Sequence, residues 1–63
     1  MNGFNKYLKR TKQSYACFGR KINKPRETVR RWAMGESIPQ SDNRNLILEA
    51  TNRKITLKDF IPL

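Results

Sequence analysis

The chain has 63 residues, of which fourteen are Lys or Arg and five are Asp or Glu, so its formal net charge at pH 7 is +9. A chain this short forms one domain with a small core and leaves little room for a deep catalytic cleft. It contains no His and one Cys, which excludes an internal disulfide and a Cys/His zinc site. We expect one cytoplasmic domain over residues 1–63, not an enzyme, with no cofactor, metal, small-molecule substrate or membrane span.

The first predicted helix runs from Phe4 to about Thr11. Its apolar face has the spacing i, i+3, i+4, i+7, which is typical of an amphipathic helix, and consists of Phe4, Tyr7, Leu8 and Thr11. Asn2 has a side chain that can cap the start of this helix.

The second predicted helix covers residues 15–22, with Ser14 as its N-cap. The same spacing recurs in Tyr15, Phe18, Gly19 and Ile22. A Gly inside a helix costs about 1 kcal/mol relative to Ala, so Gly19 indicates that another backbone passes close to this point. Asn23 can adopt a left-handed conformation and end the helix.

The third predicted helix begins near Pro25, because proline is favoured at the first helical position, and ends at Gly35. Its inward-facing residues are Val29, Trp32 and Ala33. Its outward-facing residues are charged and lie one turn apart: Arg26, Glu27, Arg30 and Arg31.

A loop over residues 36–40 follows, in which Ile38 is expected to point inward. The fourth predicted helix starts between Pro39 and Asp42, with Ser41 as its cap, and runs to about Thr51. Its expected inward face consists of Leu46, Ile47 and Ala50.

The last predicted element is a single helical turn over residues 57–60. Thr56 and Asp59 have the spacing of a capping box. The core is then expected to be completed by Ile55, Leu57 and Phe60. No stretch alternates with period two, so the sequence predicts an all-α fold.

The positive charge is concentrated in the first half of the chain. Residues 1–35 contain ten basic residues and one acid, whereas residues 36–63 contain four of each. Such asymmetry favours a polyanionic partner, either nucleic acid or an anionic membrane surface; charge that serves only solubility is the alternative. The apolar residues are divided among short capped segments, which argues against a membrane-surface helix.

The second and third predicted helices are joined by about three residues, 23–25. Two short helices joined by so tight a turn must cross steeply, which is helix-turn-helix geometry. Residues 14–39 resemble the Cro- and lambda-repressor-type helix-turn-helix proteins, above all in Thr28-Val29-x-Arg31-Trp32-x-x-Gly35. The tail, Ile55-Thr56-Leu57-x-Asp59-Phe60-x-Pro62, is similar to the end of compact Cro-like phage and prophage regulators.

The resemblance covers roughly residues 4–62 and implies a lambda-repressor-like domain of four or five helices, with the helix-turn-helix at about residues 14–34. The sequence departs from the family at four positions. The family usually has Ala in place of Gly19, Gly in place of Asn23, an apolar residue in place of Lys24 and often Gln in place of Tyr15.

The resemblance also implies that the third helix enters the DNA major groove, with its N-terminal residues at base edges. The implied base-reading residues are Arg26, Glu27, Arg30 and Arg31. Arg suits guanine and Glu suits the amino group of cytosine, so a G·C-containing half-site is expected. The candidate phosphate-binding residues are Lys12, Ser14, Tyr15, Arg20, Lys21, Lys24 and Ser37.

Each of these assignments has an alternative. Glu27 and Arg31 are spaced i, i+4, so they can pair with each other instead of contacting bases. Arg26 and Arg30 can be solvated, and Tyr15 can belong to the core. Cys17 has no His partner that would activate its thiol.

The resemblance implies a transcriptional regulator of a prokaryotic cell or phage-infected host, most simply a Cro-like repressor that occupies an operator. Its partner would be double-stranded DNA, bound as a weak homodimer or as monomers that pair on DNA. The candidate self-association residues are Leu48, Leu57, Ile61, Pro62 and Leu63. The competing hypothesis is an antitoxin-like or accessory helix-turn-helix module that acts mainly through a protein partner.

Overall fold

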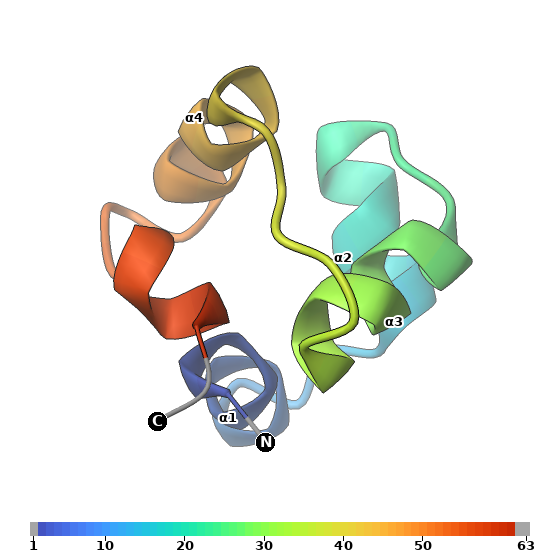
Figure 1. Cartoon of the computed structure of the whole chain (residues 1–63). Coiled ribbons are helices and arrows are strands. Elements are labelled where there is room, and N and C mark those ends of the chain that lie inside the picture. The colour runs from blue at the N-terminus through green and yellow to red at the C-terminus, as the bar shows by residue number, and fades with distance from the viewer. Residues whose placement is uncertain (1, 62–63) are drawn as a thin grey trace.

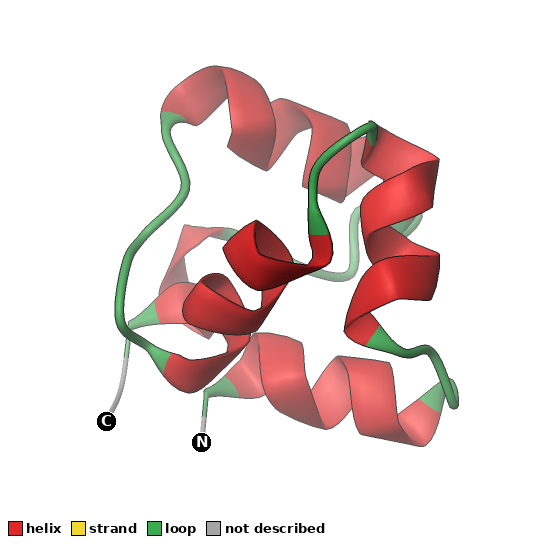
Figure 2. Cartoon of the chain, turned by 90° about the vertical axis from the view of Figure 1, so that its right-hand side faces the viewer, coloured by secondary structure: helices red, strands yellow, loops and turns green. Residues whose placement is uncertain are grey.

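The structure is a computed structural model of the chain, and it describes residues 2–61. The elements are α1 (Gly3–Arg10), α2 (Tyr15–Ile22), α3 (Arg26–Met34), α4 (Ser41–Ala50) and the 3₁₀ turn η1 (Leu57–Phe60) (Figure 1). Residues 2–61 contain helices and loops but no strand (Figure 2). The all-α prediction is therefore confirmed. No helix within this range is both long and apolar enough to cross a membrane.

The helix ends depend on the residues that the sequence indicated. The Asn2 side chain accepts a hydrogen bond from the Asn5 N–H at 2.9 Å and caps α1. The Ser14 Oγ accepts from the Cys17 N–H at 3.0 Å and caps α2. Both caps satisfy backbone donors that have no partner inside the helix.

The C-terminal ends of α2 and α3 are closed by left-handed residues. Asn23 has φ 59° and ψ 46°, and Gly35 has φ 78° and ψ 13°. At both positions the chain must leave the helix axis sharply, which favours Asn or Gly. The capping box of η1 is also formed, since the Asp59 Oδ2 accepts from the Thr56 N–H at 2.8 Å.

The helices α3 and α4 start where the sequence predicts, but the positions assigned to Pro25 and Ser41 within those starts were wrong by one residue. Pro25 occupies the N-cap of α3 instead of its first helical position, and Arg26 is the first residue of the helix. Ser41 is the first residue of α4, and Gln40 occupies the N-cap without a side-chain hydrogen bond. Pro25 has extended backbone dihedrals (φ −66°, ψ 152°), which continue the turn before the helix begins.

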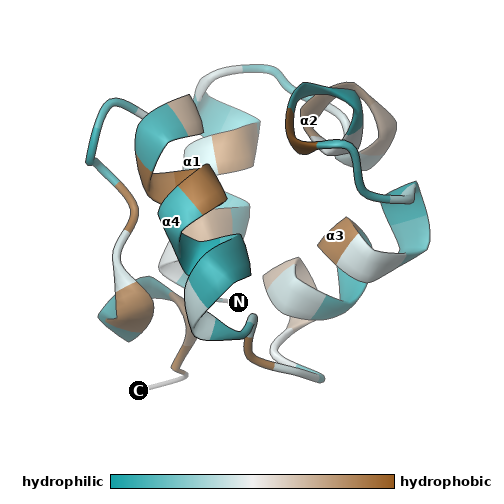
Figure 3. Cartoon of the chain, turned by 90° about the horizontal axis from the view of Figure 1, so that it is seen from above, coloured by the Kyte–Doolittle hydropathy of each residue, from teal (hydrophilic) through white to brown (hydrophobic). Residues whose placement is uncertain are grey.

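The core is centred on Phe4 of α1. The Phe4 ring lies edge-on to Phe18 of α2, with 5.2 Å between centroids, and tilted against Phe60 of η1 at 5.1 Å. All five elements and the loop before η1 contribute buried apolar side chains to one cluster: Phe4, Tyr7, Leu8, Phe18, Ile22, Val29, Trp32, Ala33, Ile47, Ile55 and Phe60. Each helix therefore has an apolar and a polar side (Figure 3).

Three residues expected in the core are exposed. Ile38 is 50% exposed because the next residue, Pro39, is buried instead. Leu46 is 44% exposed, since Ile47 points into the core and successive helical residues are about 100° apart. Leu57 is 44% exposed, because Ile55 and Phe60 fill the core on either side of it.

Two buried polar side chains connect segments that are distant in the sequence or end a helix. The Asn2 amide donates to the Trp32 carbonyl oxygen at 2.6 Å, which fixes α3 against the start of α1. The Thr51 hydroxyl donates to the Ile47 carbonyl at 2.8 Å and accepts from the Ile55 N–H at 3.3 Å. These bonds satisfy polar groups that would otherwise be costly to bury.

Candidate nucleic-acid interface

The α2–α3 pair is held together at Gly19. The Lys24 N–H donates to the Gly19 carbonyl oxygen at 2.8 Å, so the turn folds back onto α2. A Cβ at position 19 would overlap the Lys24 carbonyl oxygen and lie 3.4 Å from Val29 Cγ2. The predicted close backbone approach is therefore confirmed, and the turn is the segment that makes it.

The two sides of α3 have opposite character, as its sequence predicts. Val29, Trp32 and Ala33 are buried. The remaining positions present three arginines, which we call the α3 arginine face: Arg26, Arg30 and Arg31. The Arg30 side chain is 37% exposed and the Arg31 side chain 59%. The buried side fixes the helix, so the arginine side has a defined direction.

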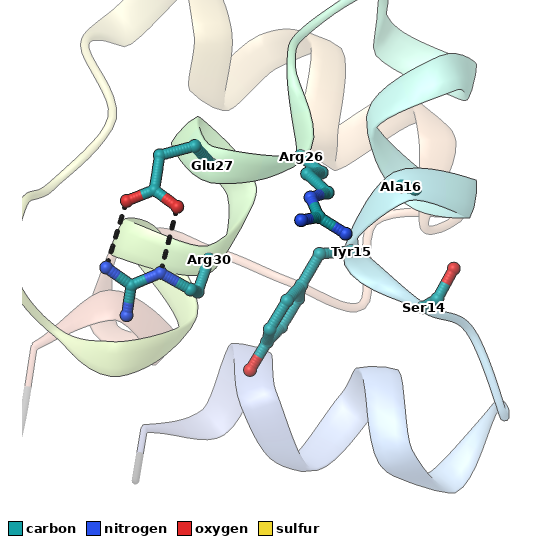
Figure 4. Close-up of a pocket in the computed structure, with 6 residues that line it drawn as sticks. All are labelled: Ser14, Tyr15, Ala16, Arg26, Glu27 and Arg30. Atoms are coloured by element: carbon teal, nitrogen blue, oxygen red, sulfur yellow. Dashed lines mark hydrogen bonds and ion pairs between the residues drawn. The ribbon is translucent and has the colours of Figure 1, made fainter.

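A groove of about 490 Å³ lies between the N-terminal ends of α2 and α3 (Figure 4). It is lined by Ser14, Tyr15, Ala16, Arg26, Glu27 and Arg30. The structure thus brings three of the four predicted base-reading residues together with two predicted phosphate-binding residues. The basic side chains of the groove come from α3. The N-terminal end of α2 forms its other side, and the backbone N–H groups there favour an anion.

Tyr15 packs against the core and also lines two hollows at the surface. It is half-buried and packs against the core cluster. Its ring extends from the start of α2 towards α1 (Figure 4), and it lines both the groove and a neighbouring hollow of about 290 Å³. That hollow also includes Gln13 and Leu8. A place in the core and a phosphate contact were alternatives for Tyr15, and its position is compatible with both.

The charged groups of α3 form an ion network. Arg30 Nε donates to Glu27 Oε1 at 3.1 Å, and Arg30 Nη2 donates to Glu27 Oε2 at 3.0 Å (Figure 4). Arg31 Nε lies 3.5 Å from Glu27 Oε2, and Arg30 Nη1 lies 3.5 Å from Glu36 Oε2. The expected Glu27–Arg31 pair is present, but the shorter, two-bond partner of Glu27 is Arg30.

This network shifts the titration of its members. The hydrogen bonds from Arg30 are the largest cause that holds the pKa of Glu27 below its ordinary value of 4.5. The same bond raises the pKa of Arg30. Glu27 is therefore ionised, and Arg30 charged, throughout the physiological range.

The other predicted phosphate-binding residues lie outside the groove lining. Lys12 is exposed in the turn between α1 and α2, with φ 57°. Arg20 and Lys21 are exposed in the last turn of α2, and Lys24 is half-buried in the turn before α3. Ser37 is exposed in the loop that follows α3.

Sequence reasoning missed two polar contacts around this surface. Glu36 reaches Arg30 from the loop beyond α3, six positions away, where no helical spacing rule applies. Gln13 accepts from the Lys21 ammonium at 2.9 Å and donates to the Thr11 hydroxyl at 2.9 Å. No short-range signal marks either residue, because both contacts depend on how the loops fold back onto the helices.

Residues proposed for other roles are also placed. Leu48 is half-buried, whereas Leu57 and Ile61 are 44% and 45% exposed; Pro62 and Leu63 lie outside the described residues. Cys17 is a free, half-buried thiol. In residues 2–61 no three His, Cys, Asp or Glu side chains gather in a way that would bind a metal ion.

The chain matches no protein-family model, no curated protein and no solved structure.

Proposed function

We propose that this chain is a sequence-specific double-stranded DNA-binding protein that regulates transcription, in the manner of a Cro-like phage or prophage repressor. The observation that carries the proposal is the α3 arginine face, exposed on a helix whose opposite side is buried by Val29 and Trp32. A helix of this kind, held across a tight turn by a preceding helix, has the geometry that fits the major groove.

The electrostatics of the surface support the same function. The α3 arginine face adjoins the capped N-terminal end of α2, where Ser14 and the backbone can donate to a phosphate. Arg side chains suit guanine O6 and N7. Occupation of an operator that overlaps a promoter would exclude RNA polymerase, and this is the regulatory step that we propose.

The direct test is selection from randomised duplex DNA, followed by footprinting of the selected site. We expect enrichment of a G·C-containing half-site, repeated as an inverted pair about one helical turn apart. Arg26→Ala should weaken binding to the selected site by about 1–3 kcal/mol, and Lys54→Ala, in the turn after α4, is the control of equal charge. Failure to enrich any sequence, or equal losses in both variants, would contradict the proposal.

A second candidate is an antitoxin-like or accessory module that acts through a protein partner. The observation that favours it is a set of large apolar side chains that are 44–50% exposed: Met34, Ile38, Leu46, Leu57 and Ile61. Two of them, Leu57 and Ile61, are also candidates for the weak homodimer expected of an operator-binding protein. Sedimentation with and without the selected DNA distinguishes the two, because pairing that requires DNA supports the repressor.

A further inference from the structure

We infer that Glu27 does not contact a base itself but is a positioning residue, which determines the base preference of the α3 arginine face by holding the guanidinium of Arg30. The inference rests on the proposed DNA-binding function and changes the role that the sequence assigned to Glu27.

Both carboxylate oxygens of Glu27 accept a hydrogen bond from Arg30. Oε1 accepts from Arg30 Nε at 3.1 Å, and Oε2 accepts from Arg30 Nη2 at 3.0 Å with Arg31 Nε 3.5 Å away. Charge-assisted two-bond contacts of this kind are among the stronger hydrogen-bonded pairs. The two-bond contact thus turns the carboxylate towards Arg30, and a cytosine amino group could use only a lone pair that Arg30 leaves free.

The Arg30 guanidinium still has donors to offer. It carries five N–H groups; Glu27 takes one on Nε and one on Nη2, and Glu36 takes one on Nη1 at 3.5 Å. One N–H on Nη1 and one on Nη2 remain. Two donors on neighbouring nitrogens match guanine O6 and N7. The carboxylates thus fix the plane of the guanidinium, and Nη1 and Nη2 each keep one N–H that neither Glu27 nor Glu36 uses.

The ion pair contributes little to folding, which favours a functional explanation. The side chains of Glu27 and Arg30 are 55% and 37% exposed, and exposed ion pairs add little stability. A carboxylate on a DNA-facing surface also repels phosphate, so it lowers affinity for DNA of any sequence. Glu27 also restricts the side-chain freedom of Arg30 before DNA binds, and this restriction sharpens discrimination between bases.

The test applies selection from randomised duplex DNA to four proteins: the natural chain, Glu27→Ala, Arg30→Ala and the double variant. Glu27→Ala should reduce the preference for guanine at one position about fivefold, and Arg30→Ala should abolish it at that same position. The double variant should match Arg30→Ala. Glu27→Ala should also bind unselected DNA about twofold to fivefold more tightly, because a negative charge is removed.

Two results would overturn the inference. Relaxation by Glu27→Ala at a position that Arg30→Ala leaves intact would show that Glu27 contacts a base, and an unchanged profile would show that it has no role in preference. If the natural chain itself enriched no sequence, the proposed DNA-binding function would fail, which is a separate outcome. Lys54→Ala, in the turn after α4, is the control, since it removes a positive charge and leaves both Glu27–Arg30 bonds in place.

A measurement without DNA tests the geometry alone. In a ¹H–¹⁵N spectrum, the Arg30 Nε–H signal of the natural chain should exchange with water more slowly than that of Arg26, which lies outside the ion network. Glu27→Gln should accelerate this exchange, while the backbone signals remain those of the folded protein. Equal exchange rates in the natural chain and the variant would contradict the positioning role, whatever the DNA results.

Discussion

The α2–α3 pair differs from the C-terminal part of the chain, α4 with η1, in how completely apolar side chains are separated from charged ones. Within the pair, apolar and charged side chains are separated except at Met34, the last residue of α3, which is 49% exposed; Val29 is buried while Arg31 is exposed. In α4 and η1 the separation is incomplete, and Leu46 and Leu57 remain 44% exposed. The first region therefore presents a charged surface on a fixed support, whereas the second supplies core residues and leaves apolar side chains at its surface.

The largest expected effect is a loss of stability, and it should distinguish the buried residue of η1 from an exposed one. Phe60→Ala should cost about 3–5 kcal/mol, because Phe60 is 1% exposed and contacts Phe4, and a domain this small has little stability to lose. Leu57→Ala should change stability by less than about 0.5 kcal/mol. Urea denaturation measures both, and equal losses would mean that the outer side of η1 is covered in solution.

The next prediction concerns the tight contact inside the α2–α3 pair. Gly19→Ala should destabilise the chain by about 1–3 kcal/mol, because the new Cβ meets the Lys24 backbone and overpacking outweighs the gain in helix propensity. Asn45→Ala, exposed in α4, should leave stability unchanged or raise it slightly. Thermal unfolding compares the two. A stabilised Gly19→Ala would show that the turn can move away from α2.

Two helix caps provide a sharper comparison between the regions. Ser14→Ala and Thr56→Ala should each cost about 1 kcal/mol of stability, since each removes a cap interaction at a helix start. Only Ser14→Ala should also weaken DNA binding, because α2 starts beside the groove. Fluorescence anisotropy measures that difference, and equal affinities would remove Ser14 from the phosphate contacts.

The charge asymmetry predicts where salt dependence originates. Lys21→Gln should reduce the slope of log affinity against log salt by about 0.9 if Lys21 neutralises one phosphate. Lys54→Gln, from the neutral second half of the chain, should leave the slope unchanged. Both lysines are exposed. Equal slopes in the two variants would indicate that DNA contacts the molecule more diffusely than the α2–α3 pair alone allows.

The smallest expected effect is a pH-dependent contribution from Glu27. Its lowered pKa means that the ionised carboxylate stabilises the fold above the ordinary value of 4.5, and that this contribution is lost as the pH falls through the folded-state pKa. The natural chain should therefore melt slightly above Glu27→Gln at pH 7, and the difference should vanish in acid. In an Arg30→Ala background the difference should already be small at pH 7.

Short-range sequence patterns predicted the helices well, because the residues at the helix ends interact with backbone groups close to them in the sequence. Asn2, Ser14, Asn23 and Gly35 act on backbone groups within a few residues, so their effect can be deduced from neighbouring positions. The inward faces of α1, α2 and α3 followed from helical spacing for the same reason, except at Thr11, which is exposed because α1 ends at Arg10. The groove could be anticipated only in part, since its residues come from two helices whose crossing had to be assumed.

The sequence by itself determined the all-α class, the N-terminal caps of α1, α2 and η1, the concentration of positive charge in residues 1–35 and the arginines on one side of α3. Only the tertiary structure decided which apolar residues of the second half are buried, because that depends on the space left beside α1 and α2. It also decided the partners of Arg30, since Glu36 reaches it from a loop. Interactions within one helical turn are specified by spacing, whereas those between elements depend on how the whole chain packs.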